Sequence, residues 1–251
     1  MFISRLAKKL ATKAFPQIAD FGVRLRAIES AFSVLATDSK YENDESSFNQ
    51  QVIRRGTTTR ILSAMKPSVI VETGTFLGNT TGYLAKFGVP VVSSEISAPL
   101  FFAAKQRLSD LSNISLRLCD SRELLRQLIS EGVNSLPTFF YLDAHWLDDL
   151  PLLDEIETIN ENWGSYIILI DDFKVANDPG YGYDNYGGKK ILNYSYIKRY
   201  IEGKPIGVFF PHTPSSQETG AKRGYVFLAK GIVNIRILSS TEELSKSNSD
   251  L

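Results

Sequence analysis

The stretch SVIVETGTFLGNTTGYL, residues 68–84, decides the fold. It starts as a continuous apolar run, passes through a turn that contains Gly74 and Gly78, and ends in a helical pattern. Near-continuous apolar strands are typical of parallel sheets that helices cover on both faces. We therefore interpret this stretch as the first strand, turn and helix of an α/β domain.

The same alternation of strand and helix continues downstream. Strands are predicted at residues 69–72, 89–94, 114–119, 138–143, 166–171, 207–210 and 224–228. Helices are predicted at residues 51–65, 80–87, 99–109, 121–131, 150–161 and 189–202. Five strand–helix alternations, followed by two strands without a clear helix between them, predict a doubly wound, mostly parallel sheet of seven strands. The last of these is expected to run antiparallel.

Three segments are expected along the chain. They are an N-terminal helical extension and loop over residues 1–50, one domain over 51–235 and a C-terminal tail over 236–251. Residues 1–35 favour one or two helices, and the polar, acidic residues 36–50 favour a linker or mobile loop. The N-terminus is basic and amphipathic in pattern. We favour its packing on the domain or on a partner subunit, as in a homodimer, over binding to a membrane surface.

The charge and cysteine content narrow the range of partners. Lysine plus arginine and aspartate plus glutamate each number 28, so the chain has no net charge and we expect no nucleic-acid partner. The single cysteine, Cys119, excludes an intramolecular disulfide and fits a reducing, cytoplasmic location. No apolar run approaches the roughly 18 to 20 residues that span a bilayer, so no membrane span is expected. A small or medium-sized molecule is the expected substrate.

Polar side chains follow each of the first three predicted strands. Glu95 ends the second strand, 21 residues after Gly74, where its carboxylate can accept both ribose hydroxyls of a nucleoside. Asp120 and Ser121 follow the third strand and can hydrogen-bond an adenine ring. The turn after the first strand contributes further candidate contacts, namely Gly74, Thr75, Phe76, Gly78, Asn79 and Thr80. Three strand ends thus converge on the crevice in which open α/β sheets bind ligands.

The residue before this turn separates two nucleoside cofactors. Glu72 stands where a dinucleotide-binding protein carries its first glycine. A carboxylate there would repel a pyrophosphate but can bind the ammonium group of an amino acid. The turn therefore favours the methionine end of S-adenosylmethionine over NAD. A solvated carboxylate at a loop edge is the alternative interpretation of Glu95.

Aspartates end the fourth and fifth predicted strands, in TFFYLDAHW (138–146) and YIILIDDF (166–173). Asp143 precedes Asp171 and Asp172 by 28 and 29 residues, and adjacent parallel strands would set the three carboxylates side by side. Such carboxylates repel one another unless a cation shares them. Oxygen ligands suit Mg²⁺ or another hard divalent cation, which could orient a substrate hydroxyl and lower its pKa.

These motifs resemble the class I S-adenosylmethionine-dependent O-methyltransferases. LDAHW, followed 28 residues later by an aspartate pair, is similar to the metal-dependent branch that includes the catechol and macrocin O-methyltransferases, and the similarity covers residues 67–230. The resemblance implies the Rossmann-like methyltransferase fold, with Asp143, Asp171 and Asp172 holding Mg²⁺. It also implies an S-adenosylmethionine pocket lined by Glu72, Gly74, Glu95, Asp120 and Ser121 and bordered by Asp143.

One departure from that family concerns the proton acceptor. The catechol enzymes carry a lysine directly after the His-Trp pair, whereas Leu147 follows Trp146 here. His145 and Asp143 are therefore the predicted catalytic residues, because an imidazole can accept a proton at neutral pH. Three alternatives stay open: His145 merely borders the cofactor, Asp148 is the base, or the metal acts without a base.

Two downstream features have an open role. Residues 175–190, VANDPGYGYDNYGGKK, place Tyr181, Tyr183 and Tyr186 between glycines. This pattern fits a loop that closes over a substrate, or a surface turn without that role. His212, between the last two predicted strands, could reach the site but is more typical of an ordinary loop residue.

Taken together, these residues predict transfer of a methyl group from S-adenosylmethionine to a hydroxyl oxygen of a small molecule or sugar, assisted by a divalent metal. Three other functions stay open. They are a metal-independent methyltransferase of the same fold, an NAD-linked oxidoreductase, and a non-catalytic protein that keeps the sheet.

Overall fold

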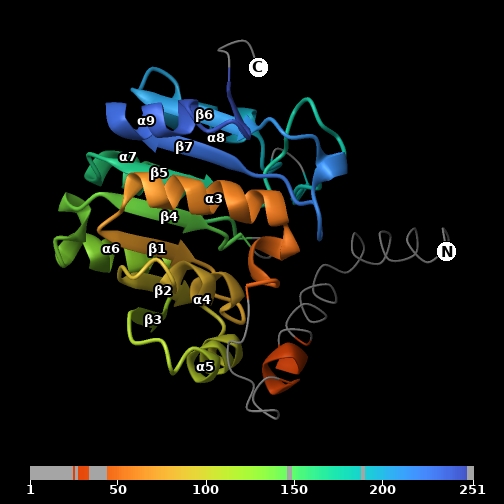
Figure 1. The fold of residues 1–251 in the computed structure, drawn as a ribbon. Helices are drawn as coiled ribbons and strands as arrows, with labels where there is room; N and C mark the ends of the chain where they lie inside the picture. The colour runs from red at the N-terminus through yellow and green to blue at the C-terminus, as the bar shows by residue number, and fades with distance from the viewer. Residues whose placement is uncertain (1–24, 26–27, 34–43, 146–148, 188–189, 248–251) are drawn as a thin grey trace, which may run out of the picture.

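One mixed sheet organises the molecule. The structure is a computed structural model that describes residues 25, 28–33, 44–145, 149–187 and 190–247. Its eight strands follow the order β3-β2-β1-β4-β5-β7-β6-β8 (Figure 1). The strands are β1 Val69–Thr73, β2 Val91–Glu95, β3 Ile114–Leu118, β4 Thr138–Leu142, β5 Tyr166–Ile170, β6 Ile206–Pro211, β7 Val226–Lys230 and β8 Leu244–Lys246.

The five strands β1 to β5 are parallel, so their carboxyl ends meet at the same edge of the sheet. β7 runs antiparallel to both β5 and β6, as the sequence predicts for the last strand of the domain. Every residue of β1, β2, β4 and β5 is buried. Their apolar runs therefore reflect a sheet that is covered on both faces.

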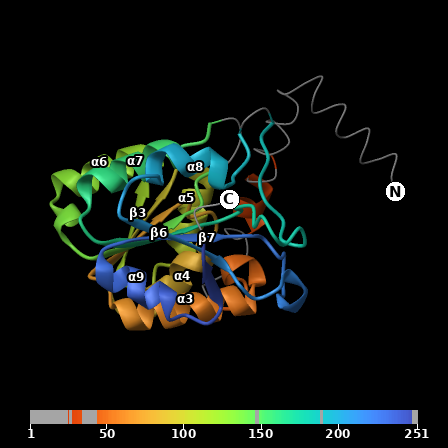
Figure 2. The ribbon, with the colours of Figure 1, turned by 90° about the horizontal axis from the view of Figure 1, so that it is seen from above.

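Helices form a layer on each side of the sheet. Figure 2 shows α6, α7 and α8 on one face and α3, α4 and α9 on the other. α5 contacts the outer strands β2 and β3. The helices are α3 Val52–Met65, α4 Asn79–Ala85, α5 Ala98–Arg107, α6 Ser121–Ser130, α7 Leu152–Asn162, α8 Tyr194–Ile201 and α9 Ile232–Ser239. The two resulting cores hold the sheet rigid, which fixes the positions of the side chains at its edge.

The predicted α/β fold with a doubly wound, mostly parallel sheet is confirmed, although the sheet has eight strands rather than seven. The additional strand, β8, pairs antiparallel with β6 and lies in the segment predicted as a C-terminal tail. Helix α9 also extends past residue 235, where the domain was predicted to end. β8 buries one apolar residue, Leu244, and exposes two polar ones, a pattern too short to predict a strand.

The prediction of a linker or mobile loop is wrong for the end of the 36–50 segment. Ser47–Gln50 form a short 3₁₀ helix, η1, in which Phe48 has no solvent exposure. The Phe48 ring packs edge-on against Tyr83 and Tyr141, with ring centroids 5.5 and 5.4 Å apart. A single aromatic residue within a polar run has no periodicity, so its burial was invisible in the sequence. Residues 36–43 lie outside the described residues.

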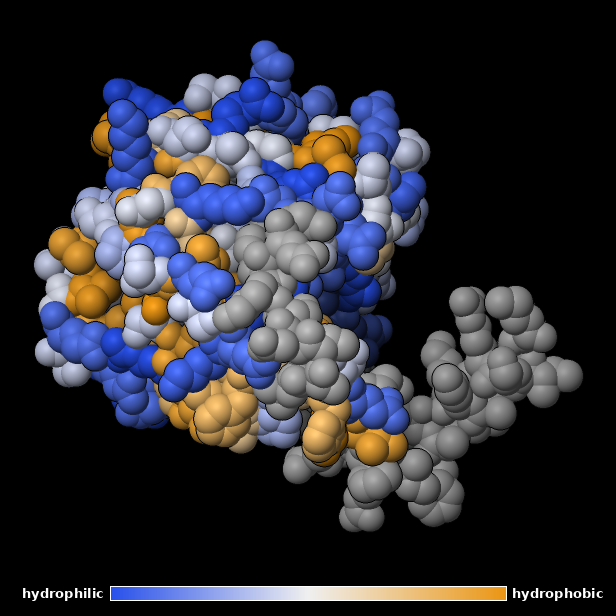
Figure 3. Space-filling model, turned by 60° about the horizontal axis from the view of Figure 1, so that its bottom comes forward, coloured by the Kyte–Doolittle hydropathy of each residue, from blue (hydrophilic) through white to orange (hydrophobic). Residues whose placement is uncertain are grey.

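Only a short part of the predicted N-terminal extension is described. Residues 25 and 28–33 are helical, and Ala31 packs against Leu100 and Ala103 of α5. Figure 3 shows the face on which these elements lie, where apolar side chains interrupt a hydrophilic surface. The exposed apolar residues of these elements include Phe32 and Phe102. Most of the predicted dimer or membrane-surface helix, residues 1–24, lies outside the description.

None of the helices among the described residues has the length and apolar character needed to cross a membrane.

Candidate functional site

A cavity of about 730 Å³ opens at the carboxyl edge of the parallel strands. Residues that follow β1, β2, β3, β4 and β5 contribute to its wall, so it lies where the sequence predicted a crevice. Of the predicted site residues it brings together Gly74, Phe76, Glu95, Asp120, Ser121, Asp143, His145 and Asp172. Predicted site residues that do not line the cavity are Glu72, Thr75, Gly78, Asn79, Thr80 and Asp171.

Gly74 allows the first turn to approach the end of β4. Its φ is +86°, in the left-handed region that side chains rarely adopt. A Cβ atom at this position would lie 2.5 Å from the backbone oxygen of Asp143. The absence of a side chain at Gly74 therefore lets the turn after β1 lie against the backbone of Asp143, directly after β4.

Glu95 shapes the same turn from the end of β2. Its carboxylate accepts hydrogen bonds from the backbone N–H groups of Phe76 and Ser97, at 2.9 and 2.8 Å. Burial raises the pKa of Glu95, and these N–H groups oppose that shift. Each carboxylate oxygen keeps a second lone pair and Glu95 lines the cavity, so it can still accept hydrogen bonds from a ligand.

Glu72 lies behind the turn rather than in the cavity wall. Its carboxylate accepts hydrogen bonds from Ser93 Oγ, at 2.5 Å, and from Thr81 Oγ1. Burial raises its pKa to about 7. In this structure Glu72 fastens α4 to β1 and β2 and does not reach the site predicted for an ammonium group. The sequence placed it at a strand end, but the alternation of side chains along β1 turned it away from the cavity.

Asp120 and Ser121 mark the start of α6. The Asp120 carboxylate accepts a hydrogen bond of 2.8 Å from the backbone N–H of Arg122, which makes it the N-cap of the helix. The Arg122 side chain also binds Asp120 and lowers its pKa. Both residues face the cavity, as the adenine-contact prediction required.

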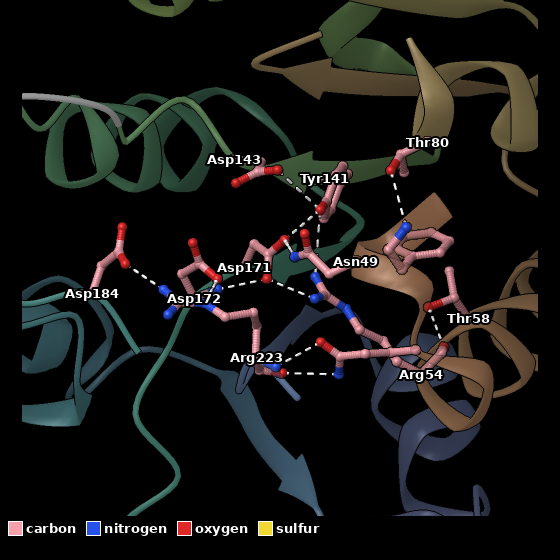
Figure 4. A network of polar contacts seen from close by, with 12 residues as sticks. Asn49, Arg54, Thr58, Thr80, Tyr141, Asp143, Asp171, Asp172, Asp184 and Arg223 are labelled. Atoms are coloured by element: carbon pink, nitrogen blue, oxygen red, sulfur yellow. Dashed lines mark hydrogen bonds and ion pairs between the residues drawn. The ribbon is translucent and has the colours of Figure 1, made fainter. Parts of the chain in front are cut away.

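The aspartates after β4 and β5 do not form the group of three that the sequence predicted. Figure 4 shows Asp171 turned toward Arg54 and Tyr141, while Asp172 lies beside Arg223. Within the part of the chain that the structure describes, the residues that can share a cation are Asp143, His145 and Asp172, whose ligand atoms lie within 4.8 Å of one another. The group therefore contains an imidazole in place of the third carboxylate.

Asp171 has both oxygens occupied. Oδ1 accepts hydrogen bonds of 2.6 Å from Arg54 Nη1 and from the backbone N–H of Asp172. Oδ2 accepts from the Tyr141 hydroxyl at 2.6 Å and from Asn49 Nδ2 at 3.2 Å. Burial alone would raise the pKa of Asp171, but Arg54 and these bonds lower it. Asp171 is thus an ionised partner of a buried arginine.

His145 is buried, with 2% of its surface exposed. Neither ring nitrogen has a hydrogen-bond partner among the described residues. Nε2 lies 3.7 Å from Asp143 Oδ1, too far for a hydrogen bond. Burial lowers the pKa of His145, so the neutral imidazole, with a free lone pair, is favoured.

The cluster holds more carboxylates than cationic partners. Four carboxyl groups, those of Asp143, Asp171, Asp172 and Asp184, face two guanidinium groups, those of Arg54 and Arg223, so two negative charges are left over when all four are ionised. Burial and the neighbouring aspartates raise the pKa of Asp143 well above its usual range. The same two causes raise the pKa of Asp172 to about 7, against the effect of Arg223. A divalent cation would balance this charge.

Several residues of the network were missed at the sequence level. Arg54 lies on α3, Asn49 on η1 and Arg223 just before β7, each more than 50 residues from at least one of its aspartate partners. The pairing of Arg54 gave no signal, because α3 shows no clear apolar face. Tyr141 was read as part of an apolar strand, although its hydroxyl reaches both Asp143 and Asp171.

The predicted loop residues fall in different places. The Tyr186 hydroxyl donates to Asp184 Oδ2 at 2.7 Å and also contacts the backbone oxygen of His145, which ties the 175–190 segment to the site. Tyr181 is buried and donates to the backbone oxygen of Thr213. His212 lines a separate cavity of about 620 Å³. Asp148 lies outside the described residues.

Solved structures share this fold at low sequence identity. An O-methyltransferase from Bacillus cereus in complex with SAH has 18% identity and a TM-score of 0.55, over 82% of this chain and 91% of that one. The O-methyltransferase TomG from Streptomyces achromogenes, involved in tomaymycin synthesis and in complex with SAM, has 14% identity and a TM-score of 0.54, over 82% and 90%. A putative O-methyltransferase from Klebsiella pneumoniae has 14% identity and a TM-score of 0.53, over 83% of this chain and 90% of that one.

Neither a protein-family model nor a curated protein matches the chain. The structural neighbours confirm the Rossmann-like methyltransferase fold that the motifs resemble.

Proposed function

We propose that this chain transfers a methyl group from S-adenosylmethionine to a hydroxyl oxygen of a small molecule or sugar. One observation carries the proposal: a single cavity joins the ends of β1, β2 and β3 to those of β4 and β5. Its volume of about 730 Å³ lies within the roughly 300 to 1,000 Å³ of small-molecule sites. A methyl donor and an acceptor can therefore occupy one space.

The donor would lie along the first three strand ends. Glu95 would accept the ribose hydroxyls with the lone pairs that Phe76 and Ser97 leave free. Asp120 and Ser121 would contact the adenine, and the backbone of Gly74 would approach the methionine part. The neighbours that bind SAH and SAM in this fold support that placement.

The acceptor would lie beside Asp143 and Asp172. The two residual negative charges of the cluster and the unpartnered imidazole of His145 fit a divalent cation. Such a cation, when bound, binds the acceptor hydroxyl and lowers its pKa. Asp143 and Asp172 would bind the cation directly. Tyr141 contacts Asp143 and Arg223 contacts Asp172, and these hydrogen bonds would hold the two carboxylates in position.

In the reaction, the acceptor oxygen would attack the methyl carbon as the methyl–sulfur bond breaks. The electron pair of that bond stays on the sulfur, and the hydroxyl proton passes to solvent water. The chain's contribution is alignment, with the oxygen held about 3 Å from the methyl group. The cavity wall supplies donor contacts from Gly74 and Glu95 and acceptor contacts from Asp143 and Asp172. The methylated acceptor and S-adenosylhomocysteine are the products.

A metal-independent methyltransferase is the second candidate, and one observation favours it. Three of the four clustered aspartates already have an arginine partner, since Arg54 binds Asp171 and Arg223 binds both Asp172 and Asp184. Protons on Asp143 and Asp172 could then replace the cation. Isothermal titration of Mg²⁺ and Zn²⁺, with and without S-adenosylhomocysteine, separates the two candidates.

Cofactor binding is the decisive experiment for the proposed function. We expect S-adenosylhomocysteine to bind the full-length chain, and Glu95→Gln to weaken binding by roughly tenfold or more, because a hydrogen bond to a charged group contributes about 1.5 to 3 kcal/mol. Glu161→Gln, at an exposed position on α7, is the matched control and should bind normally. Tight binding of NAD without binding of S-adenosylhomocysteine would refute the proposal.

A further inference from the structure

Asp143, His145 and Asp172 present two carboxylates and one imidazole to a single part of the cavity. One ligand atom from each lies within 4.8 Å of the other two. His145 Nε2 and Asp143 Oδ1 are 3.7 Å apart. Two ligands about 2.1 Å from one metal ion lie about 3.4 Å apart at a tetrahedral angle. A small inward shift would therefore complete a shared coordination site.

The imidazole of His145 lies in the cavity wall without a polar partner among the described residues. It is 2% exposed, lines the cavity and makes no hydrogen bond through Nδ1 or Nε2 to any described residue. A buried polar atom that lacks a partner lowers stability by about 1 to 3 kcal/mol, so such groups usually indicate a missing ligand or water. Because Nε2 lies 3.7 Å from Asp143 Oδ1, one cation between them could bind both.

Asp171, by contrast, is not available for a cation. It accepts four hydrogen bonds, one of which belongs to an ion pair with Arg54, and neither side chain of that pair is exposed. Moving Asp171 toward the cavity would leave a buried guanidinium without its counter-ion. Asp172 differs, since Arg223 binds its Oδ1 and no hydrogen bond from a described residue is found at Oδ2.

We propose that the cation site of this chain consists of Asp143, Asp172 and His145, and that it binds Fe²⁺, Co²⁺ or Zn²⁺ in preference to Mg²⁺. Mg²⁺ takes oxygen ligands, whereas imidazole nitrogen suits the later first-row metals. The position of the cation beside the methyl donor rests on the proposed function, whereas the set of three ligands does not. A lone pair that binds a metal cannot accept a proton, so His145 becomes a ligand and not the predicted base.

Metal affinity gives the first test, on the full-length chain. Isothermal titration should show tighter binding of Co²⁺ and Zn²⁺ than of Mg²⁺. Loss of a residue that only hydrogen-bonds a metal ligand weakens metal binding by roughly 10- to 100-fold. His145→Ala removes a ligand itself, so it should weaken Co²⁺ binding by at least that factor. His212→Ala is the matched control, because the chain has two histidines and His212 lines the other cavity. Equal affinities for Co²⁺ and Mg²⁺ would overturn the proposal.

The two histidines also allow a test that needs no site variant. A chain labelled with ¹⁵N-histidine gives ring-nitrogen signals from His145 and His212 alone, and His212→Ala assigns them. One equivalent of Zn²⁺ should shift the His145 signals and leave those of His212 in place. A shift confined to His212, or no shift, would refute His145 as a ligand even if His145→Ala failed to fold.

The failure of this inference is distinguishable from the failure of the proposed function. Binding of S-adenosylhomocysteine together with Mg²⁺-selective or absent metal binding would overturn the ligand assignment and leave methyl transfer standing. Zn²⁺ binding through His145 without binding of S-adenosylhomocysteine would refute methyl transfer and leave the ligand assignment standing.

Discussion

Arg54 Nη1 lies 2.6 Å from Asp171 Oδ1, and neither side chain is exposed to solvent. The guanidinium also lies 5.1 to 5.7 Å from the ring centroids of Phe48, Tyr141 and Tyr225. This ion pair connects α3 to the end of β5. It also explains why the second aspartate of the predicted metal site lies outside the group that could bind a cation.

Removal of this arginine should destabilise the protein. We expect Arg54→Met to lower the free energy of unfolding by about 3 to 5 kcal/mol, because Asp171 would remain charged and buried without a counter-ion. The double variant Arg54→Met, Asp171→Asn should recover part of that loss. Urea unfolding measures both, and Arg60→Met, in an exposed pair with Glu243, should cost less than about 1 kcal/mol. A loss at Arg54 no larger than that control would contradict the expectation.

A methyl group at Gly74 should disturb both stability and the cavity. Gly74→Ala adds about 1 to 2 kcal/mol of left-handed backbone strain and places a Cβ 2.5 Å from the Asp143 backbone oxygen. Gly88→Ala is the matched control, since its φ is also positive but no atom of the described residues lies within 4 Å of the added Cβ. Thermal unfolding should shift more for Gly74→Ala, and binding of S-adenosylhomocysteine should weaken for that variant alone. Identical shifts would show that the close approach does not matter.

Glu155, buried on α7, should make stability depend on pH. Burial raises its pKa from 4.5 to about 7, while the hydroxyls of Ser121 and Thr73 oppose the shift. Between pH 4.5 and about 7 the Glu155 carboxyl is therefore protonated in the folded state and ionised in the unfolded state. The free energy of unfolding falls as the pH rises through this range, from about 5 to 7. Glu155→Gln should be more stable than the parent by roughly 3 kcal/mol at pH 8 and by less at pH 5.

Urea unfolding at several pH values measures this difference. Glu157→Gln, at an exposed position on the same helix, should leave the pH dependence of the parent unchanged. A Glu155→Gln advantage that is constant across pH would rule out titration of Glu155 as the cause.

Phe48 should behave as a core residue, although it stands in a polar segment. Phe48→Ala is expected to cost about 3 to 5 kcal/mol of unfolding free energy, the usual range for a buried phenylalanine. Phe32→Ala, at a residue with 66% exposure, should cost much less. Denaturant unfolding decides between the two. Equal costs would restore the interpretation of residues 47–50 as part of a linker.

The sequence predicted most of the strands but only part of the candidate site. Residues 69–71 and 166–170 are apolar along their whole length, and strands buried on both faces require such a pattern, so the sheet was predictable from them. β8 was not, because Leu244 is its one buried residue. At the site, Gly74, Glu95, Asp120 and Asp143 reach the cavity because each lies at or just after the carboxyl end of a parallel strand.

The direction in which side chains point at those strand ends could not be predicted from the sequence. Asp171 and Asp172 are neighbours, yet one points to Arg54 and the other to Arg223. Their partners come from segments 117 and 51 residues away in the chain.

The sequence by itself determined the alternation of strands and helices from β1 to β7 and which polar residues reach the carboxyl edge of the sheet, because both follow from local periodicity along the chain. The tertiary structure decided which of those side chains are already neutralised and which remain unpaired. Charge balance depends on contacts between distant segments. Arg54 therefore removed Asp171 from the candidate cation site, and the burial of His145 placed an imidazole in it.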